Sequence, residues 1–205
     1  MTAAEIETAV TGARLDPLAT EIAGQFQSYL ELLQKWNARL NLTAIRDPEE
    51  ILQRHFVECI FAARHLPAET RSLLDFGSGG GFPGIPIALC RPEIQVTLGE
   101  SQSKKAAFLR ETVRSLGIRN AEVYNGRVEV LKERFEAVTL RAVDKMQEAC
   151  QDAIPLVTPG GYLILFLADK AAEDAVSEFN QFQWDAPILL PASTQRRLLI
   201  GQKPS

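Results

Sequence analysis

The pattern of apolar residues changes near residue 70. Before that point, apolar residues recur every three or four positions, which is the period of a helix buried on one face. The clearest such helix spans about 17–40. Its apolar positions are Phe26, Tyr29, Leu30, Leu33, Trp36 and Leu40. A second helix is expected after Asp47, which suits an N-cap, with Pro48 in the first turn. The pattern predicts no strand in this region.

After residue 70, short apolar runs alternate with helical patterns. The predicted strands are 72–76, 94–99, 121–124, 136–141, 161–167, 187–190 and 196–202. The predicted helices are 84–91, 102–116, 127–132, 145–156 and 170–180. Such alternation indicates a mostly parallel sheet with helices on both faces. Only residues 191–195 separate the last two strands, so these are expected to form an antiparallel hairpin. The predicted fold class is α/β, Rossmann-like, with an N-terminal helical extension.

The division near residue 70 also predicts the domain organisation. Residues 1–68 form a helical region, and residues 69–205 form the α/β domain. No stretch rich in Pro, Gly or Ser separates them. We therefore expect the helices to pack on the α/β body as one compact unit.

One stretch has the chemistry of a ligand site. The predicted strand ending at Phe76 is followed by glycine at 77, 79, 80 and 81, and then by the helix that starts near Gly84. A strand, a glycine loop and a helix bring backbone N–H groups close to a small ligand, because glycine has no Cβ to block the approach. The stretch predicts a site for a nucleoside-bearing cofactor.

Neighbouring residues favour one cofactor over the others. Asp75 would repel a pyrophosphate but suits an ammonium group. Pro83 and Pro86 remove N–H donors that a pyrophosphate would need at the helix start. Both features favour S-adenosylmethionine and disfavour an NAD-dependent oxidoreductase. Glu100 ends the next strand, where a carboxylate can accept both ribose hydroxyls.

Composition narrows the class of protein further. The net charge of −4 argues against a broad basic face, although not against a local basic cleft. The first residues lack the basic and apolar parts of a signal peptide, and no apolar run approaches membrane-spanning length. The three cysteines are widely spaced, which favours reduced thiols and disfavours a zinc site. We therefore expect a cytoplasmic protein without a metal, and a monomer is the simplest oligomeric state.

Several motifs resemble one family, and together they cover most of the chain. They include residues 73–86, residues 33–46 with their Lys-Trp-Asn and Asn-Leu-Thr segments, Arg54-His-Phe56, Arg127-Val-Glu129, Arg141-Ala142 and Arg197-Leu-Leu199. This set resembles the bacterial 16S ribosomal RNA guanine-N7 methyltransferases, also called the glucose-inhibited division protein B family. The resemblance implies a seven-stranded methyltransferase fold, S-adenosylmethionine as cofactor, and 16S rRNA or the 30S subunit as partner.

The resemblance also implies residue roles. Gly77 and Phe82 match loop residues at the cofactor, and Val128 and Glu129 match the pair beside the adenine. Arg141 matches the arginine facing the methyl-transfer cleft, so it is both the candidate catalytic residue and a cofactor contact. The remaining candidate cofactor contacts are Asp75, Gly79, Glu100 and Ser101.

The chain departs from the family's usual pattern on the substrate side. Glu58 and Cys59 stand where Asp-Ser is usual, Asp169 lies in a segment that is usually Leu-Lys-Gly, and Gly99 replaces an apolar residue. A methyltransferase acting on another RNA or a small molecule therefore stays open, as does a binding module without activity. We interpret Trp36 and Trp184 as core or interface residues. His55 fits a core histidine and a substrate contact equally well.

Overall fold

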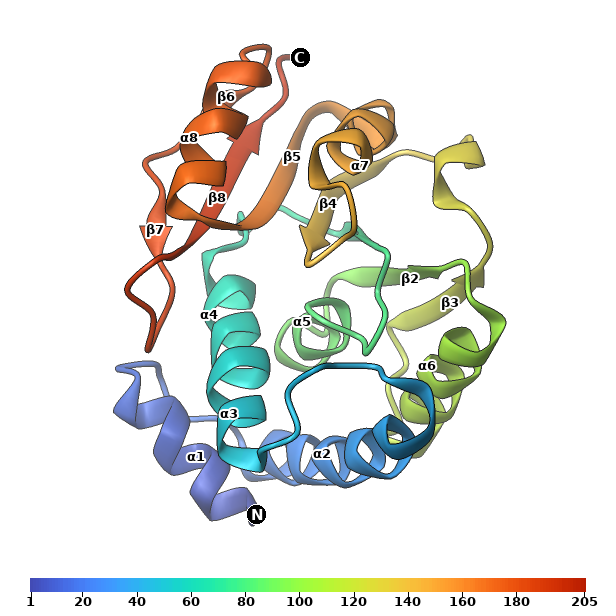
Figure 1. Ribbon diagram of the computed structural model, residues 1–205, viewed down its shortest axis with the longest axis vertical. Coiled ribbons are helices and arrows are strands. Elements are labelled where there is room, and N and C mark those ends of the chain that lie inside the picture. Colours follow the sequence, from blue (N-terminus) through green and yellow to red (C-terminus); the bar gives the residue numbers. More distant parts are fainter.

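The computed structural model describes residues 1–205, and its centre is one sheet (Figure 1). The strands are β1 (Ser72–Phe76), β2 (Gln95–Glu100), β3 (Ala121–Asn125), β4 (Phe135–Arg141), β5 (Val157–Ala168), β6 (Gln183–Trp184), β7 (Ile188–Leu189) and β8 (Arg196–Gln202). Their order is β3-β2-β1-β4-β5-β8-β6, with β7 also paired to β8. The first five strands are parallel, and β8 runs antiparallel to its neighbours. The predicted α/β fold and the antiparallel C-terminal hairpin are confirmed.

The strand predicted at 187–190 is shorter than expected. Only Ile188 and Leu189 pair with β8, and the unpredicted β6 pairs with the far end of the same strand, Trp184 opposite Gly201. A Cβ on Gly201 would lie 2.4 Å from the Trp184 ring, so the missing side chain makes room for the indole. The edge of the sheet is therefore built from two short segments instead of one strand.

Helices cover both faces of the sheet. The helices are α1 (Ala3–Gly12), α2 (Thr20–Leu40), α3 (Pro48–Ile51), α4 (Glu58–His65), α5 (Gly84–Cys90), α6 (Ser103–Ser115), α7 (Met146–Ala153) and α8 (Asp169–Glu178), with a π-helical turn η1 (Leu52–Val57) and 3-10 turns η2 (Val128–Val130) and η3 (Ile154–Leu156). Adjacent residues of a strand point to opposite faces. Leu73 accordingly packs with α4, α5 and α6, whereas Leu74 packs with α7 and α8. None of these helices is both long and apolar enough to cross a lipid bilayer.

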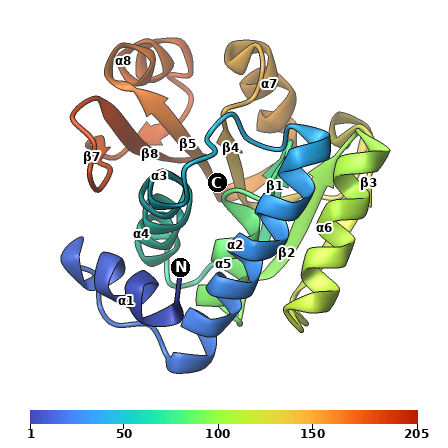
Figure 2. The same ribbon diagram turned by 60° about the horizontal axis from the view of Figure 1, so that its bottom comes forward.

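The N-terminal helices share the core of the sheet. Phe26 and Leu33 of α2 and Phe56 of η1 belong to the same buried cluster as Leu73 of β1 and Ile164 of β5. In Figure 2, α2 lies alongside α5 and α6, in front of the sheet. Burial of apolar side chains across this boundary is the main force that holds the helical region on the α/β body.

The helix predicted after Asp47 is continuous from Pro48 to His65 through the π-helical turn. Asp47 Oδ1 accepts a hydrogen bond from the Glu50 N–H at 2.8 Å, as an N-cap should. The wider π turn rotates the buried face, so Ile51 and Leu52 are both buried, and so are Cys59 and Ile60. This turn brings His55 and Glu58 to the carboxyl edge of the sheet.

Candidate active site

A cleft of about 320 Å³ opens at the carboxyl ends of β1, β2 and β4. Its lining residues are Phe76, Gly77, Gly99, Ser101, Gly126, Arg127, Val128, Glu129, Val143, Asp144, Lys145, Glu148, Ala149 and Asp152. Strand β1 lies between β2 and β4, so the chain leaves the sheet in opposite directions on its two sides. Ligands of open parallel sheets bind at this switch point.

Two glycines shape the floor of the cleft. Gly77 has φ +73°, a conformation that residues with a Cβ rarely adopt. A Cβ on Gly99 would lie only 2.3 Å from Cγ1 of Val128, so the buried Val128 side chain uses the space that the usual apolar residue would fill. The Val128 side chain therefore fills the space left by the missing side chain at Gly99, and this wall of the cleft stays apolar.

The cleft is acidic. Glu129, Asp144, Glu148 and Asp152 line it together with only two bases, Arg127 and Lys145. Both bases are paired with acids of the cleft, since Lys145 lies 3.1 Å from Glu148 and Arg127 lies 2.5 Å from Glu129. Burial disfavours the charge of Glu129, but hydrogen bonds from its own backbone and from Arg127 outweigh that effect and lower its pKa. This charge distribution fits a cationic ligand and opposes a phosphate.

Asp75 does not line the cleft. Its carboxylate is buried and accepts hydrogen bonds from the Gly84 N–H and from Thr139 Oγ1, both at 3.1 Å. Burial raises the pKa of Asp75 to about 6. The carboxylate ties the first turn of α5 to β1 and β4, so its direct effect is on the path of the glycine loop.

Glu100 also holds the glycine loop. One carboxylate oxygen accepts the Gly79 N–H at 3.0 Å, and the other accepts the Gln102 N–H at 2.7 Å. Gly79 and Glu100 lie beside the cleft but are absent from its lining. Each carboxylate oxygen has a further lone pair, so these contacts leave capacity for ribose hydroxyls.

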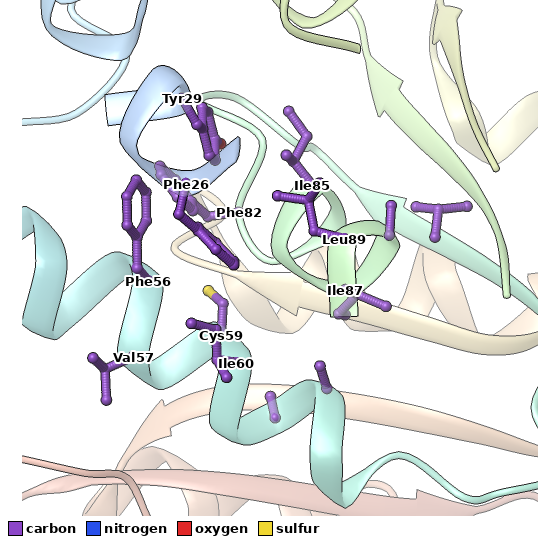
Figure 3. Close-up of a cluster of buried hydrophobic side chains, with 14 of the residues drawn as sticks. Phe26, Tyr29, Phe56, Val57, Cys59, Ile60, Phe82, Ile85, Ile87 and Leu89 are labelled. Carbon is purple, nitrogen blue, oxygen red and sulfur yellow. The ribbon is translucent and has the colours of Figure 1, made fainter. Parts of the chain in front are cut away.

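Phe82 anchors the glycine loop to the N-terminal helices. Its ring stacks on His55 at 4.5 Å and on Tyr29 at 5.3 Å between centroids. Figure 3 shows Phe82 beside Phe26 and Tyr29 of α2, with α4 below and α5 opposite. The Tyr29 hydroxyl also donates a hydrogen bond to the Gly80 carbonyl. The loop is therefore fixed from the helical region as well as from the sheet.

Arg141 points toward the N-terminal helices and is absent from the cleft lining. Its Nη2 donates to Glu58 Oε2 at 3.2 Å and to the Arg54 carbonyl, and its guanidinium lies 5.9 Å from the Phe82 ring and 5.6 Å from the Phe166 ring. The other oxygen of Glu58 binds Arg196 of β8. Glu58 is 1% exposed, so one buried carboxylate joins α4 to the ends of β4 and β8.

A chain of hydrogen bonds links this carboxylate to α2. Arg141 Nη1 donates to His55 Nδ1 at 2.9 Å, which leaves the proton on Nε2, at 2.7 Å from Thr43 Oγ1. Asn37 binds the backbone of Thr43 through both amide atoms at 3.0 Å. Asn37 belongs to the Lys-Trp-Asn segment and Thr43 to the Asn-Leu-Thr segment. These two family motifs thus connect α2, through His55, to Arg141. His55 has the contacts of a satisfied core histidine.

His55 is expected to stay neutral over a wide pH range. Burial, and then the charges of Arg141, Arg54 and Arg196, lower its pKa to about 3. Its contribution to stability is therefore complete above pH ~6.5, the value for an unfolded chain, and is lost as the pH falls toward 3. The raised pKa of Asp75 makes the folded state more stable as the pH falls, which is the opposite of the effect of His55. The pH dependence of unfolding therefore does not report on His55 alone.

Nuclear magnetic resonance isolates His55 directly. In a His65→Gln variant, which leaves one histidine, the imidazole signals should not shift between pH 8 and pH 4, that is, down to roughly one unit above the lowered pKa of about 3. A titration midpoint near 6.5 would show that the contacts with Arg141 and Thr43 are not maintained in solution.

Sequence reasoning missed the far wall of the cleft. Val143, Asp144 and Lys145 follow β4, whereas Glu148 lies in the first turn of α7 and Asp152 in its last turn. Their position just after a predicted parallel strand was the available signal, because the carboxyl ends of such strands meet at one edge. The expected contacts Gly77, Ser101, Val128 and Glu129 do line the cleft.

The fold is that of the methyltransferases. Cofactor-bound Rv0187 from MTB superposes with a TM-score of 0.64 over 88% of this chain and 90% of that one, at 19% identity. An O-methyltransferase from Bacillus cereus, solved in complex with SAH, gives a TM-score of 0.61 over 86% and 91%, at 18% identity. At such identities the likeness establishes the fold alone.

Sequence comparison establishes the family. The model of GidB, rRNA small subunit methyltransferase G, matches residues 22–195. A relative from Stenotrophomonas maltophilia K279a named ribosomal RNA small subunit methyltransferase G is 43% identical over 79% of this chain and 75% of its own. A relative of the same name from Chloroflexus aggregans is 38% identical over 91% and 84%. The chain belongs to the rRNA small subunit methyltransferase G family, as its motifs indicated.

Proposed function

We propose that the chain transfers a methyl group from S-adenosylmethionine to guanine N7 in 16S rRNA of the small ribosomal subunit. The observation that carries the proposal is the acidic, glycine-floored cleft at the switch point of the sheet. It suits a cofactor with a sulfonium and an ammonium group, and the relatives are named for modifying small-subunit ribosomal RNA. A substrate in the ribosome implies a cytoplasmic location.

The residues of the cleft fit this cofactor. Gly77 and Gly99 leave room for its approach, and Val128 with Phe76 offers an apolar wall to adenine. Glu129 offers a carboxylate to the base edge, and Glu100, held beside Gly79, offers one to the ribose. Ser101, which follows Glu100 directly, also lines the cleft. Asp75, Phe82 and Arg141 support the site by holding the glycine loop and the end of β4.

The chemistry requires positioning more than proton transfer. When bound, S-adenosylmethionine supplies an electrophilic methyl group on its sulfonium. Guanine N7 has an in-plane lone pair and no proton, so its attack needs no general base. The protein has to align the base with the cleft and exclude water. Consistently, both ring nitrogens of His55 are occupied, and burial raises the pKa values of Cys59, Cys90 and Cys150 to about 12.

The decisive experiment measures transfer of a tritiated methyl group to 30S subunits, to naked 16S rRNA and to a pool of small metabolites. We expect incorporation into RNA and chain cleavage at the modified base after borohydride and aniline treatment, which cut at N7-methylguanine. Incorporation into the metabolite pool alone would replace the proposal with a small-molecule methyltransferase. Incorporation into RNA without that cleavage would indicate a different target atom.

A further inference from the structure

A second concave site lies between α2 and α6, outside the cofactor cleft. Its volume is about 290 Å³, and its lining residues are Lys35, Trp36, Arg39, Leu40 and Glu111. The two helices lie side by side in Figure 2. They run antiparallel, because Gln25 near the start of α2 binds the carbonyl of Leu116 after α6, whereas Trp36 packs on Phe108 at 5.8 Å between ring centroids.

Trp36 lies at the edge of the core, against which one side of its ring packs. Its indole rests on Phe108, yet the side chain is only half-buried and forms part of the groove wall. The fully buried aromatic positions of α2 are Phe26 and Tyr29 instead. An aromatic side chain in an open groove offers a surface on which an unpaired nucleobase can stack.

The groove is flanked by unpaired positive charge. Lys35 and Arg39 are exposed, and neither takes part in an ion pair of the structure. Lys104 is likewise exposed and unpaired, and it lies at the end of α6 that the antiparallel arrangement places near Arg39. In a chain with a net charge of −4, two free bases in the groove wall and a third near its end make a local positive surface of the kind that phosphate groups bind. Glu111 is the acid of the groove and can accept a hydrogen bond from a base amino group.

The Leu40 end of the groove leads to the glycine loop that lies beside the cofactor cleft. Leu40 lines the groove, and the carbonyl oxygen of Leu42 lies 3.4 Å from the position of a Cβ on Gly80 in the glycine loop. Leu40 and Leu42 are two residues apart, so they lie within about 7 Å of each other. On the other side, Ser101 lines the cleft and α6 begins at Ser103.

We propose that the groove between α2 and α6 binds an unpaired nucleotide of the RNA substrate that flanks the guanine entering the cleft. Trp36 stacks on its base, while Lys35 and Arg39 bind its phosphates. A base that enters an active site must leave its stack, so its neighbours in the strand are also exposed for recognition. The inference rests on the proposed RNA substrate and assigns where that RNA is held.

The charge contribution is tested with a Lys35→Gln/Arg39→Gln variant, assayed for methyl transfer to the RNA substrate over a range of salt concentrations. We expect KM for RNA to rise about tenfold or more at low salt, and the slope of log KM against log salt to fall by about 1.4, as for two lost contacts to a single strand. The maximal rate and the cofactor affinity should not change. The matched control is Arg119→Gln/Lys132→Gln, which removes two exposed bases preceding β3 and β4.

The stacking contribution is tested at Trp36. In a Trp184→Phe background, Trp36 is the only tryptophan, and a single-stranded RNA with the target sequence should quench its fluorescence. Trp36→Leu should raise KM for RNA, whereas Trp36→Phe, which keeps an aromatic ring, should leave KM close to that of the unaltered chain. Unchanged KM in all groove variants, or equal changes in the control, would overturn the groove assignment while leaving methylation by the unaltered chain intact. Absence of any transfer to RNA by the unaltered chain would instead overturn the proposed function.

Discussion

Replacing Gly77 with valine is expected to abolish cofactor binding in a chain that remains folded. The methyl groups would project from the floor of the cleft toward Val143, which lies 3.6 Å from the position of the new Cβ. The cleft is narrow there, so the branched side chain and the cofactor compete for the same volume. Affinity should fall at least about 100-fold, or about 2.8 kcal/mol, in a calorimetric titration with S-adenosylmethionine.

Gly117 provides the control for backbone strain. It has φ +65°, close to the +73° of Gly77, but a Cβ at Gly117 would meet no atom within 4 Å. Each valine should therefore cost a similar ~1–2 kcal/mol of stability through the left-handed conformation. Only Gly77→Val should lose binding. If the two variants bind S-adenosylmethionine equally well, the cleft is not the cofactor site.

The second large effect concerns stability. Glu58→Gln should lower the free energy of unfolding by about 3 kcal/mol, because it leaves the guanidinium of Arg141 nearly buried beside Arg196 without a compensating charge. The measurement is equilibrium unfolding in urea, with the slope against denaturant expected to stay constant. The variant Glu58→Asp retains the charge but is one methylene shorter, so its cost should be smaller.

Glu50 provides the matched control on the same continuous helix. Its carboxylate pairs with Arg54 at 2.9 Å, but both side chains are more than 40% exposed, at 48% and 43%. Glu50→Gln should therefore cost less than about 1 kcal/mol. If Glu58→Gln proves as mild as Glu50→Gln, Glu58 does not hold the charged cluster together.

Much of the fold followed from the sequence because it depends on local periodicity. The parallel strands, the hairpin and the helix after Asp47 each have a clear apolar pattern or cap. The split edge of the sheet did not follow, because β6 is two residues long and depends on the absence of a side chain at Gly201. The π-helical turn also has no signal in the periodicity, although it explains why adjacent apolar residues are both buried.

The sequence predicted the residues at the floor of the cleft but not those of its far wall or the contacts of Arg141. Gly77 and Val128 follow from the glycine loop and from the resemblance to a family. The acidic wall after β4 depends on how α7 packs, which no local pattern encodes. Arg141 lies at the expected strand end, but the direction of its side chain is set by Glu58 and His55 from another helix. Its role in methyl transfer stays a prediction, and the contacts support a positioning role.

The ion pair between Glu58 and Arg196 joins residues 138 positions apart, from the first third of the chain to its last strand. During synthesis, α4 leaves the ribosome long before β8 exists. Docking α4 at that stage would bury the Glu58 carboxylate before Arg141 or Arg196 could reach it, which is costly. Helix α4 should therefore dock late, after the C-terminal strand has been added. We therefore expect α4 to take its final place against the order of translation.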